Sequence, residues 1–140
     1  RGAGAQLNER RIRVTQQAQL EGALLGTGFP FKAQQHLDAY LGMFRALFPQ
    51  TAGIRRAGSA SLDLAYVASG RLDGFWEIGL NIWDMAAGVL LIQESGGLCS
   101  DLVGGHDYLE SGNIVTASPK LFQHMLKAIR PHVSAELGRS

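Results

Sequence analysis

The chain has 140 residues, of which 46% are apolar and 18% are charged, and its formal net charge is +1 at pH 7. This length and composition suffice for one compact domain with a hydrophobic core and argue against a disordered chain. The near-neutral charge argues against nucleic acid as a main partner, because a duplex-binding face needs clustered lysine and arginine. Arg10, Arg11 and Arg13, and further on Arg55 with Arg56, form only short basic runs of the kind that is usually solvated.

Cys99 is the only cysteine, so the chain forms no internal disulfide and nothing in it indicates an oxidising compartment. We expect its thiol to be a buried small side chain. No apolar run approaches the roughly 18 residues needed to cross a bilayer, and no segment resembles a signal peptide. These features predict a cytoplasmic protein without membrane contact. The chain begins at Arg1 without an initiator methionine, and we interpret it as a fragment.

Strand-like apolar runs alternate with segments of helical periodicity along the chain, which predicts an α/β layered domain. In chain order the predicted elements are a strand at 11–14, an apolar run at 23–27, a helix over 33–48, a strand at 54–57, a helix over 59–69, a strand at 73–78, a helix over 83–95, strands at 98–101 and 113–116, and a helix over 119–129. Glycine and proline end several of these elements. Residues 1–130 form the predicted lobe, and the polar tail 131–140 is expected to fray.

Asp84 opens an otherwise apolar helix, and its carboxylate has two interpretations. It can cap the helix by accepting hydrogen bonds from free N–H groups of the first turn. It can instead point out of the helix start at a hard cation such as Mg²⁺, which favours oxygen ligands. In the second case Trp83 would pack behind the ligand, and the small residues Ala86, Ala87 and Gly88 would let the helix lie close to its neighbour.

Two further segments lie directly after a strand or before a helix, where ligands gather in an open α/β sheet. Glu77 ends an apolar strand, and its carboxylate is either exposed at the rim or an acceptor for the hydroxyls of a polyol substrate. Gly58, Ser59 and Ala60 open a helix whose free N–H groups can attract a ligand, although the same pattern is a routine helix entry capped by Ser59. In that helix we expect a buried side made of Leu62, Ala65, Tyr66 and Ala68.

Taken together, these segments closely resemble the inositol monophosphatase family, most of all its bacterial SuhB-type members. The matching runs extend from Gly58 through Gly74, over Phe75-Trp76-Glu77, and over Trp83-Asp84-Met85-Ala86-Ala87-Gly88. Further matching residues are Gly2-Ala3-Gly4-Ala5, Asn8, Thr27-Gly28-Phe29-Pro30-Phe31, Glu94-Ser95-Gly96-Gly97 and Asp101. The resemblance covers nearly the whole chain apart from the tail.

The resemblance implies a layered α/β sugar-phosphatase fold, of which this chain is the C-terminal lobe. It also implies Mg²⁺-dependent hydrolysis of inositol monophosphate or a related sugar phosphate by a homodimeric parent, typically inhibited by lithium. Asp84 would then be the catalytic, metal-binding aspartate, Glu77 would contact inositol hydroxyls, and Gly58, Ser59 and Ala60 would line the substrate pocket.

One departure from the family pattern matters for activity. The family draws its other metal ligands from an earlier glutamate motif and from an Asp-Pro-(Ile/Leu)-Asp-Gly-Thr motif, and neither occurs in these 140 residues. We therefore expect an absent N-terminal half and little turnover by this chain alone. A smaller departure is Ile82, which stands where many relatives have proline and is expected to alter loop stiffness only.

Two alternatives to an inositol phosphatase stay open. SuhB-type members are also associated with bacterial transcription antitermination, so the chain could supply a surface for a transcription-machinery protein, with phosphatase activity incidental. Related sugar or nucleotide phosphatases share the Trp-Asp metal motif and would differ in substrate. The histidines form no pair with metal-ligand spacing, and we expect His36 and His124 on exposed helix faces.

Overall fold

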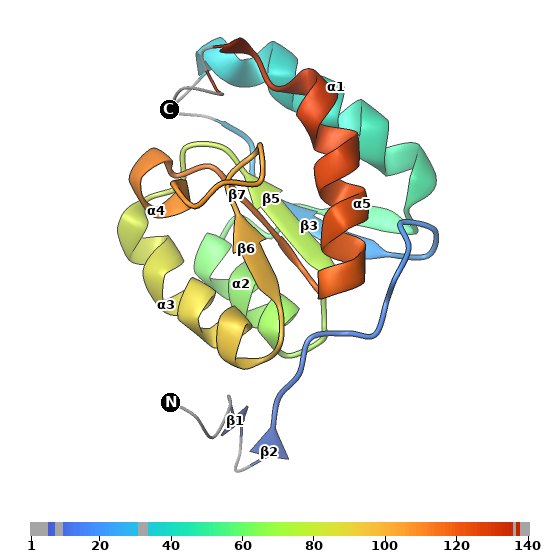
Figure 1. The fold of residues 1–140 in the computed structure, drawn as a ribbon, viewed down its shortest axis with the longest axis vertical. Helices are drawn as coiled ribbons and strands as arrows, with labels where there is room; N and C mark the ends of the chain where they lie inside the picture. Colours follow the sequence, from blue (N-terminus) through green and yellow to red (C-terminus); the bar gives the residue numbers. More distant parts are fainter. Residues whose placement is uncertain (1–5, 8–9, 31–33, 136, 138–140) are drawn as a thin grey trace.

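The structure is a computed structural model that describes residues 6–7, 10–30, 34–135 and 137 (Figure 1). Its helices and strands, in chain order, are β1 (Gln6–Leu7), β2 (Arg10–Arg11), β3 (Leu24–Thr27), η1 (Gln34–His36), α1 (Leu37–Leu47), η2 (Phe48–Gln50), β4 (Gly53–Arg55), α2 (Ala60–Ala68), β5 (Gly74–Glu77), α3 (Ile82–Glu94), β6 (Leu98–Ser100), α4 (Tyr108–Ser111), β7 (Ile114–Ala117), α5 (Pro119–Ile129) and η3 (Arg130–His132). None of the described helices is long and apolar enough to span a membrane.

A five-stranded sheet in the order β4-β3-β5-β7-β6 forms the centre of the lobe. Strands β3, β4 and β5 are parallel, and β7 runs antiparallel to both of its neighbours. The chain passes from β3 through α1 to β4, and then through α2 back across β3 to β5. Because both crossovers in such a sheet are right-handed, this reversal places α1 and α2 on opposite faces. It also makes the carboxyl end of β3 a topological switch point, where open α/β sheets bind ligands.

Helices cover both faces of the sheet, so the lobe has three layers (Figure 1). Strand β5 shows the division: Trp76 packs in the cluster formed with α1 and α5, whereas Phe75 packs in the cluster formed with α2 and α3. Successive side chains of a strand point to opposite faces, and both faces are covered here. All four residues of β7 are buried for the same reason. The predicted α/β class with alternating strands and helices is confirmed.

Two parts of the predicted element order are wrong. The strand predicted at 11–14 extends no further than Arg11, because Val14 donates its backbone N–H to the Ser95 carbonyl (3.1 Å) at the end of α3 and not to a neighbouring strand. Helix α4 was not predicted, since four residues are too few for a helical period to show in the sequence. The matching residues Gly2 to Ala5, Asn8 and Phe31 lie outside the described residues.

The described part of the C-terminal segment packs on the core. Arg130–His132 form η3, and Leu137 is only 3% exposed within the cluster that includes α1 and α5. The Ser134 hydroxyl accepts a hydrogen bond from the Leu137 N–H at 3.2 Å. Leu137 and the partly buried Val133 therefore anchor a segment whose composition is mostly polar. Residues 136 and 138–140 lie outside the description.

The sequence predicted the burial of three side chains, those of His124, His36 and Cys99, and the structure shows how exposed each one is. His124 is exposed on α5 as predicted. The prediction for His36 is wrong: it is buried (9% exposed) because it lies in the 3-10 turn before α1 and not on the helix itself. Cys99 is partly buried, and burial raises the pKa of its thiol to about 11, so the thiolate is disfavoured at neutral pH.

Asp101 holds the turn that follows β6. Its Oδ1 accepts hydrogen bonds from the backbone N–H groups of Val103 (3.0 Å) and Gly105 (2.7 Å), and the residue is 8% exposed. Replacement by alanine leaves both donors without this acceptor, so we expect Asp101→Ala to lower the free energy of unfolding by about 2 kcal/mol. Asp101→Asn keeps an acceptor oxygen and should lose less. Urea denaturation followed by circular dichroism measures both, and equal losses would contradict this role for Oδ1.

Candidate functional site

A pocket of about 160 Å³ opens at the carboxyl ends of the parallel strands β3, β4 and β5. It brings together every site residue predicted from the sequence, namely Gly58, Ser59, Ala60, Glu77 and Asp84. The remaining lining residues are Thr27, Gly28, Phe29, Arg56, Asp63 and Leu80. Three carboxylates from three different elements therefore line one small space at the topological switch point of the sheet.

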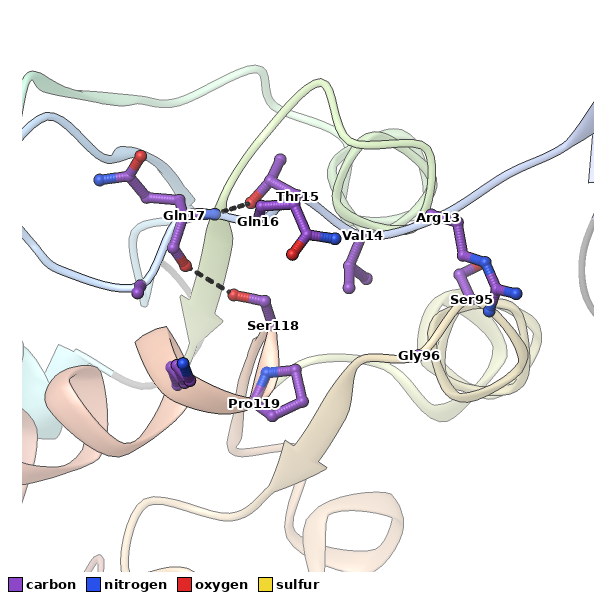
Figure 2. Close-up of a pocket in the computed structure, with 11 residues that line it drawn as sticks. Arg13, Val14, Thr15, Gln16, Gln17, Ser95, Gly96, Ser118 and Pro119 are labelled. Carbon is purple, nitrogen blue, oxygen red and sulfur yellow. Dashed lines mark hydrogen bonds between the residues drawn. The ribbon is translucent and has the colours of Figure 1, made fainter.

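A larger pocket of about 410 Å³ lies elsewhere, between residues 13–18 and the segments at Ser95 and Ser118 (Figure 2). There the Ser118 hydroxyl donates to the Gln17 carbonyl at 2.9 Å, and the Gln17 N–H donates to the Thr15 hydroxyl at 3.4 Å. Its lining includes no carboxylate, histidine or cysteine side chain. The smaller pocket is therefore the better candidate for chemistry.

The start of helix α2 is a capped helix entry that also lines the pocket. The Ser59 hydroxyl accepts a hydrogen bond from the Leu62 N–H at 3.3 Å, so Ser59 caps the helix. Gly58 has a φ of +84°, a left-handed conformation that favours glycine, and no atom lies within 4 Å of the position a Cβ would take. The capped entry thus presents open backbone to the pocket.

Asp84 does not cap its helix. The cap of α3 is Asn81, whose Oδ1 accepts a hydrogen bond from the Trp83 N–H at 2.8 Å. Asp84 is the third residue of α3 and is exposed, and within the described part of the chain no hydrogen bond ends on its carboxylate. The capping interpretation is therefore wrong, and the carboxylate is available to a ligand in the pocket.

Two expectations about the neighbours of Asp84 are also wrong. The Trp83 side chain is 85% exposed and does not pack behind the carboxylate. Ala86 and Ala87 are exposed as well, so they do not bring α3 close to α2. Gly88 alone does so, because a Cβ there would lie 2.6 Å from Leu64 Cδ1 and 2.7 Å from Leu64 Cβ.

Asp63 is the pocket carboxylate that was not predicted from the sequence. It is 2% exposed, on the buried side of α2 with Leu64, Val67 and Ala68, whereas the predicted buried side was displaced around the helix. The signal was present, since Asp63 lies four residues before Val67 and therefore on the same helix face. A carboxylate on a buried helix face is rare without a partner or a function.

Two carboxylates of the pocket, those of Glu77 and Asp63, are held in an environment that disfavours their charge. Burial, together with the negative charges of Asp63 and Asp84, raises the pKa of Glu77 to about 7, and the positive charge of Arg56 opposes the shift. Burial likewise raises the pKa of Asp63 to about 6, against the charge of Arg55. Excess negative potential of this kind is relieved by a bound cation.

From the raised pKa of Glu77 we predict how the free energy of unfolding depends on pH. Below pH 4.5 the carboxyl is protonated in both states; between pH 4.5 and about 7 the folded protein keeps a proton that the unfolded chain has lost. The free energy of unfolding therefore falls as pH rises through this window. Glu77→Gln removes the titrating group, so we expect it to raise the free energy of unfolding of the metal-free protein at pH 8. This gain should exceed the effect of the same substitution at pH 4.5 by on the order of 2 kcal/mol. Urea denaturation at both pH values measures this, and an equal effect at both would contradict the raised pKa.

The fit of a divalent cation to these residues is partial. Within the described ranges no three His, Cys, Asp or Glu side chains are placed to hold a metal ion together. Asp84 can supply one oxygen ligand, and Mg²⁺ commonly takes one or two protein carboxylates together with water and substrate phosphate. The described residues could therefore hold no more than one side of a magnesium site.

The end of β3, which forms one wall of the pocket, is held by an aromatic and hydroxyl network. The Thr27 hydroxyl donates to the Trp76 carbonyl at 3.0 Å and lies 3.1 Å from the Tyr40 hydroxyl. Tyr40 stacks on Trp76 with ring centroids 5.8 Å apart and meets Phe29 edge-on at 5.5 Å. The Arg56 guanidinium lies 5.0 Å above the Phe29 ring, which extends the network to the pocket rim.

A three-layer α/β lobe with small residues and carboxylates at the carboxyl ends of its parallel strands has the architecture of an α/β phosphatase. The chain belongs to the inositol monophosphatase family, whose sequence profile matches residues 1–134. Nus factor SuhB of Pseudomonas aeruginosa is 62% identical to it over 141 residues, which cover 99% of this chain and 52% of that protein.

Solved structures of the family have the same fold. The extragenic suppressor protein suhB of Bartonella henselae superposes with a TM-score of 0.88 at 43% identity, over 93% of this chain and 50% of that one. An inositol monophosphatase from Anabaena (Nostoc) sp. PCC 7120 gives a TM-score of 0.86 at 37% identity, over 93% of this chain and 54% of that one. The chain thus spans about half the length of these relatives.

Proposed function

We propose that this chain is the C-terminal half of a homodimeric, cytoplasmic, magnesium-dependent inositol monophosphatase and contributes the substrate-binding side of its active site. The observation that carries the proposal is the single pocket that joins Asp84, Glu77 and the start of α2. It is supported by the match to the inositol monophosphatase family over residues 1–134. The N-terminal half of the full-length protein would supply the remaining metal ligands and the groups that activate water.

In this proposal each part of the pocket has one task. Asp84 holds Mg²⁺ from the start of α3, and the ion, when bound, supplies charge stabilisation for the phosphate. Glu77 accepts hydrogen bonds from ring hydroxyls and orients the inositol. The open backbone at Gly58 allows the substrate to approach closely, and the N-terminus of α2 favours its negative charge.

Mg²⁺-dependent phosphate release from inositol 1-phosphate, run in parallel on the full-length protein and on this chain, tests the proposal. Activity in the full-length protein that lithium inhibits, with little or none in the 140-residue chain, supports it. Comparable activity in both would show that the chain needs no ligands from another half. Activity only on a different sugar or nucleotide phosphate would support a phosphatase but contradict inositol monophosphate as its substrate.

A protein-binding function is the second candidate, because the relative from Pseudomonas aeruginosa is named a Nus factor. Under it the full-length protein binds a component of the transcription antitermination machinery, and hydrolysis is incidental. Absence of phosphatase activity together with a stable complex with that machinery would favour this function. The two functions can also reside on separate surfaces of one protein, which a substitution at Asp84 distinguishes.

A further inference from the structure

The Glu77 carboxylate lies against the bare backbone of Gly28. Strands β3 and β5 pair in parallel with Thr27 opposite Trp76, so Gly28 and Glu77 directly follow a paired position. A Cβ built on Gly28 would lie 2.3 Å from Glu77 Oε1, 2.5 Å from Cδ and 3.0 Å from Oε2. The whole carboxylate therefore occupies the space that a side chain at position 28 would take.

We propose that Gly28 is a positioning residue for Glu77. With no side chain at position 28, the carboxylate lies close to the end of β3, and this contact sets how far it reaches into the pocket. The consequence for specificity rests on the proposed function, in which Glu77 binds substrate hydroxyls. The contact itself does not depend on that function.

The surroundings of Gly28 allow a clean substitution. Its φ lies outside the left-handed region, so alanine can adopt this backbone conformation. The three nearest obstructing atoms belong to the end of one flexible side chain. Gly26 on the same strand differs, because a Cβ there would meet Leu72 Cδ1 at 2.9 Å and Phe75 Cδ1 at 3.2 Å in the core. Alanine at position 28 should move the carboxylate and leave the fold in place.

The displaced carboxylate would change substrate binding more than the reaction step. In the full-length protein we expect Gly28→Ala to raise KM for inositol 1-phosphate by about tenfold and to change kcat by less than about twofold, since a contact made in both ground and transition states is weakened. The matched control is Gly53→Ala in β4, where a Cβ makes only an ordinary contact of 3.7 Å with Leu24 Cδ1. The control should leave both constants within about twofold of wild type.

A double-mutant cycle separates positioning from a direct effect. If Gly28 acts through Glu77, then Gly28→Ala has no further effect on KM in the Glu77→Ala background. An equal rise in KM in both backgrounds, or no rise in the wild-type background, overturns the proposal. If Gly28→Ala fails to fold, the double variant must fold again, because it removes the obstructing carboxylate; failure of both overturns the proposal as well.

A structural measurement keeps the test independent of the reaction. The crystal structure of the Gly28→Ala variant should show the Glu77 carboxylate displaced from the end of β3, with the backbone of β3 unchanged. A carboxylate that stays in place with a shifted strand overturns the positioning role. Should wild-type protein not hydrolyse inositol 1-phosphate, the proposed function fails, and the crystal structure still decides the positioning role.

Discussion

Asp84→Asn in the full-length protein will reduce Mg²⁺-dependent phosphate release from inositol 1-phosphate by a factor on the order of 1,000, or about 4 kcal/mol of transition-state stabilisation. Asparagine keeps the size of the side chain and removes the charge that would hold the ion. The fold should not change, because Asn81 caps α3 and within the described residues nothing donates a hydrogen bond to the Asp84 carboxylate.

Asp38→Asn is the matched control, since Asp38 also lies exposed in the first turn of a helix, α1, and outside the pocket. It should keep full activity, and both variants should melt within about 2 °C of wild type. Unchanged activity of Asp84→Asn would contradict a metal-binding role. If Asp84→Asn kept a complex with the antitermination machinery while losing hydrolysis, the two functions would use separate surfaces; loss of both would place them together.

Gly88→Val will lower the free energy of unfolding by about 3 kcal/mol, because helices α2 and α3 approach too closely for any side chain at this position. The atoms in the way are Leu64 Cδ1 at 2.6 Å and Leu64 Cβ at 2.7 Å, and the latter cannot move without the backbone of α2. Forcing the helices apart would also move Asp63 and Asp84, which lie on α2 and α3 at the two sides of the pocket.

Ala87→Val is the control for Gly88→Val, since Ala87 is the preceding residue of α3 and is exposed. It carries the lower helix propensity of valine without the collision and should cost about 0.6 kcal/mol. Urea denaturation of the full-length protein, followed by circular dichroism, gives both values. Equal losses for the two variants would mean that propensity and not the contact with Leu64 determines the effect.

The helices that could be predicted best from the sequence are those whose apolar residues form a single stripe on one helix face. Helix α5 shows this well, because Leu121, Met125 and Ile129 recur four residues apart and all three are buried. Helices α2 and α3 are apolar on more than one side, so their periodicity does not say which side faces the sheet. For this reason the predicted buried side of α2 is confirmed at Ala68 and wrong at Leu62, which is exposed, and Asp63 was overlooked.

Part of the candidate site could be predicted in its members, but its geometry could not. Glu77, Asp84 and the start of α2 stand out because loops at strand ends and helix starts gather at one edge of a parallel sheet, and the pocket contains all of them. The exposure of Trp83 could not be read from the sequence, since it depends on which surfaces pack against α3. The space that Gly28 leaves for Glu77 depends on strand register, which the sequence does not reveal directly.

At the start of α3 one residue caps the helix and another lines the pocket, and this separation has an evolutionary consequence. Asn81 caps the helix, and Asp84 lines the pocket three residues later. Under the proposed function, selection for folding and selection for metal binding therefore act on different codons. A lineage can lose the aspartate by drift without a penalty in stability, and selection on any binding surface would then preserve the protein. Catalytically silent descendants should therefore arise readily from this architecture, with an intact helix cap and a substituted carboxylate as their mark.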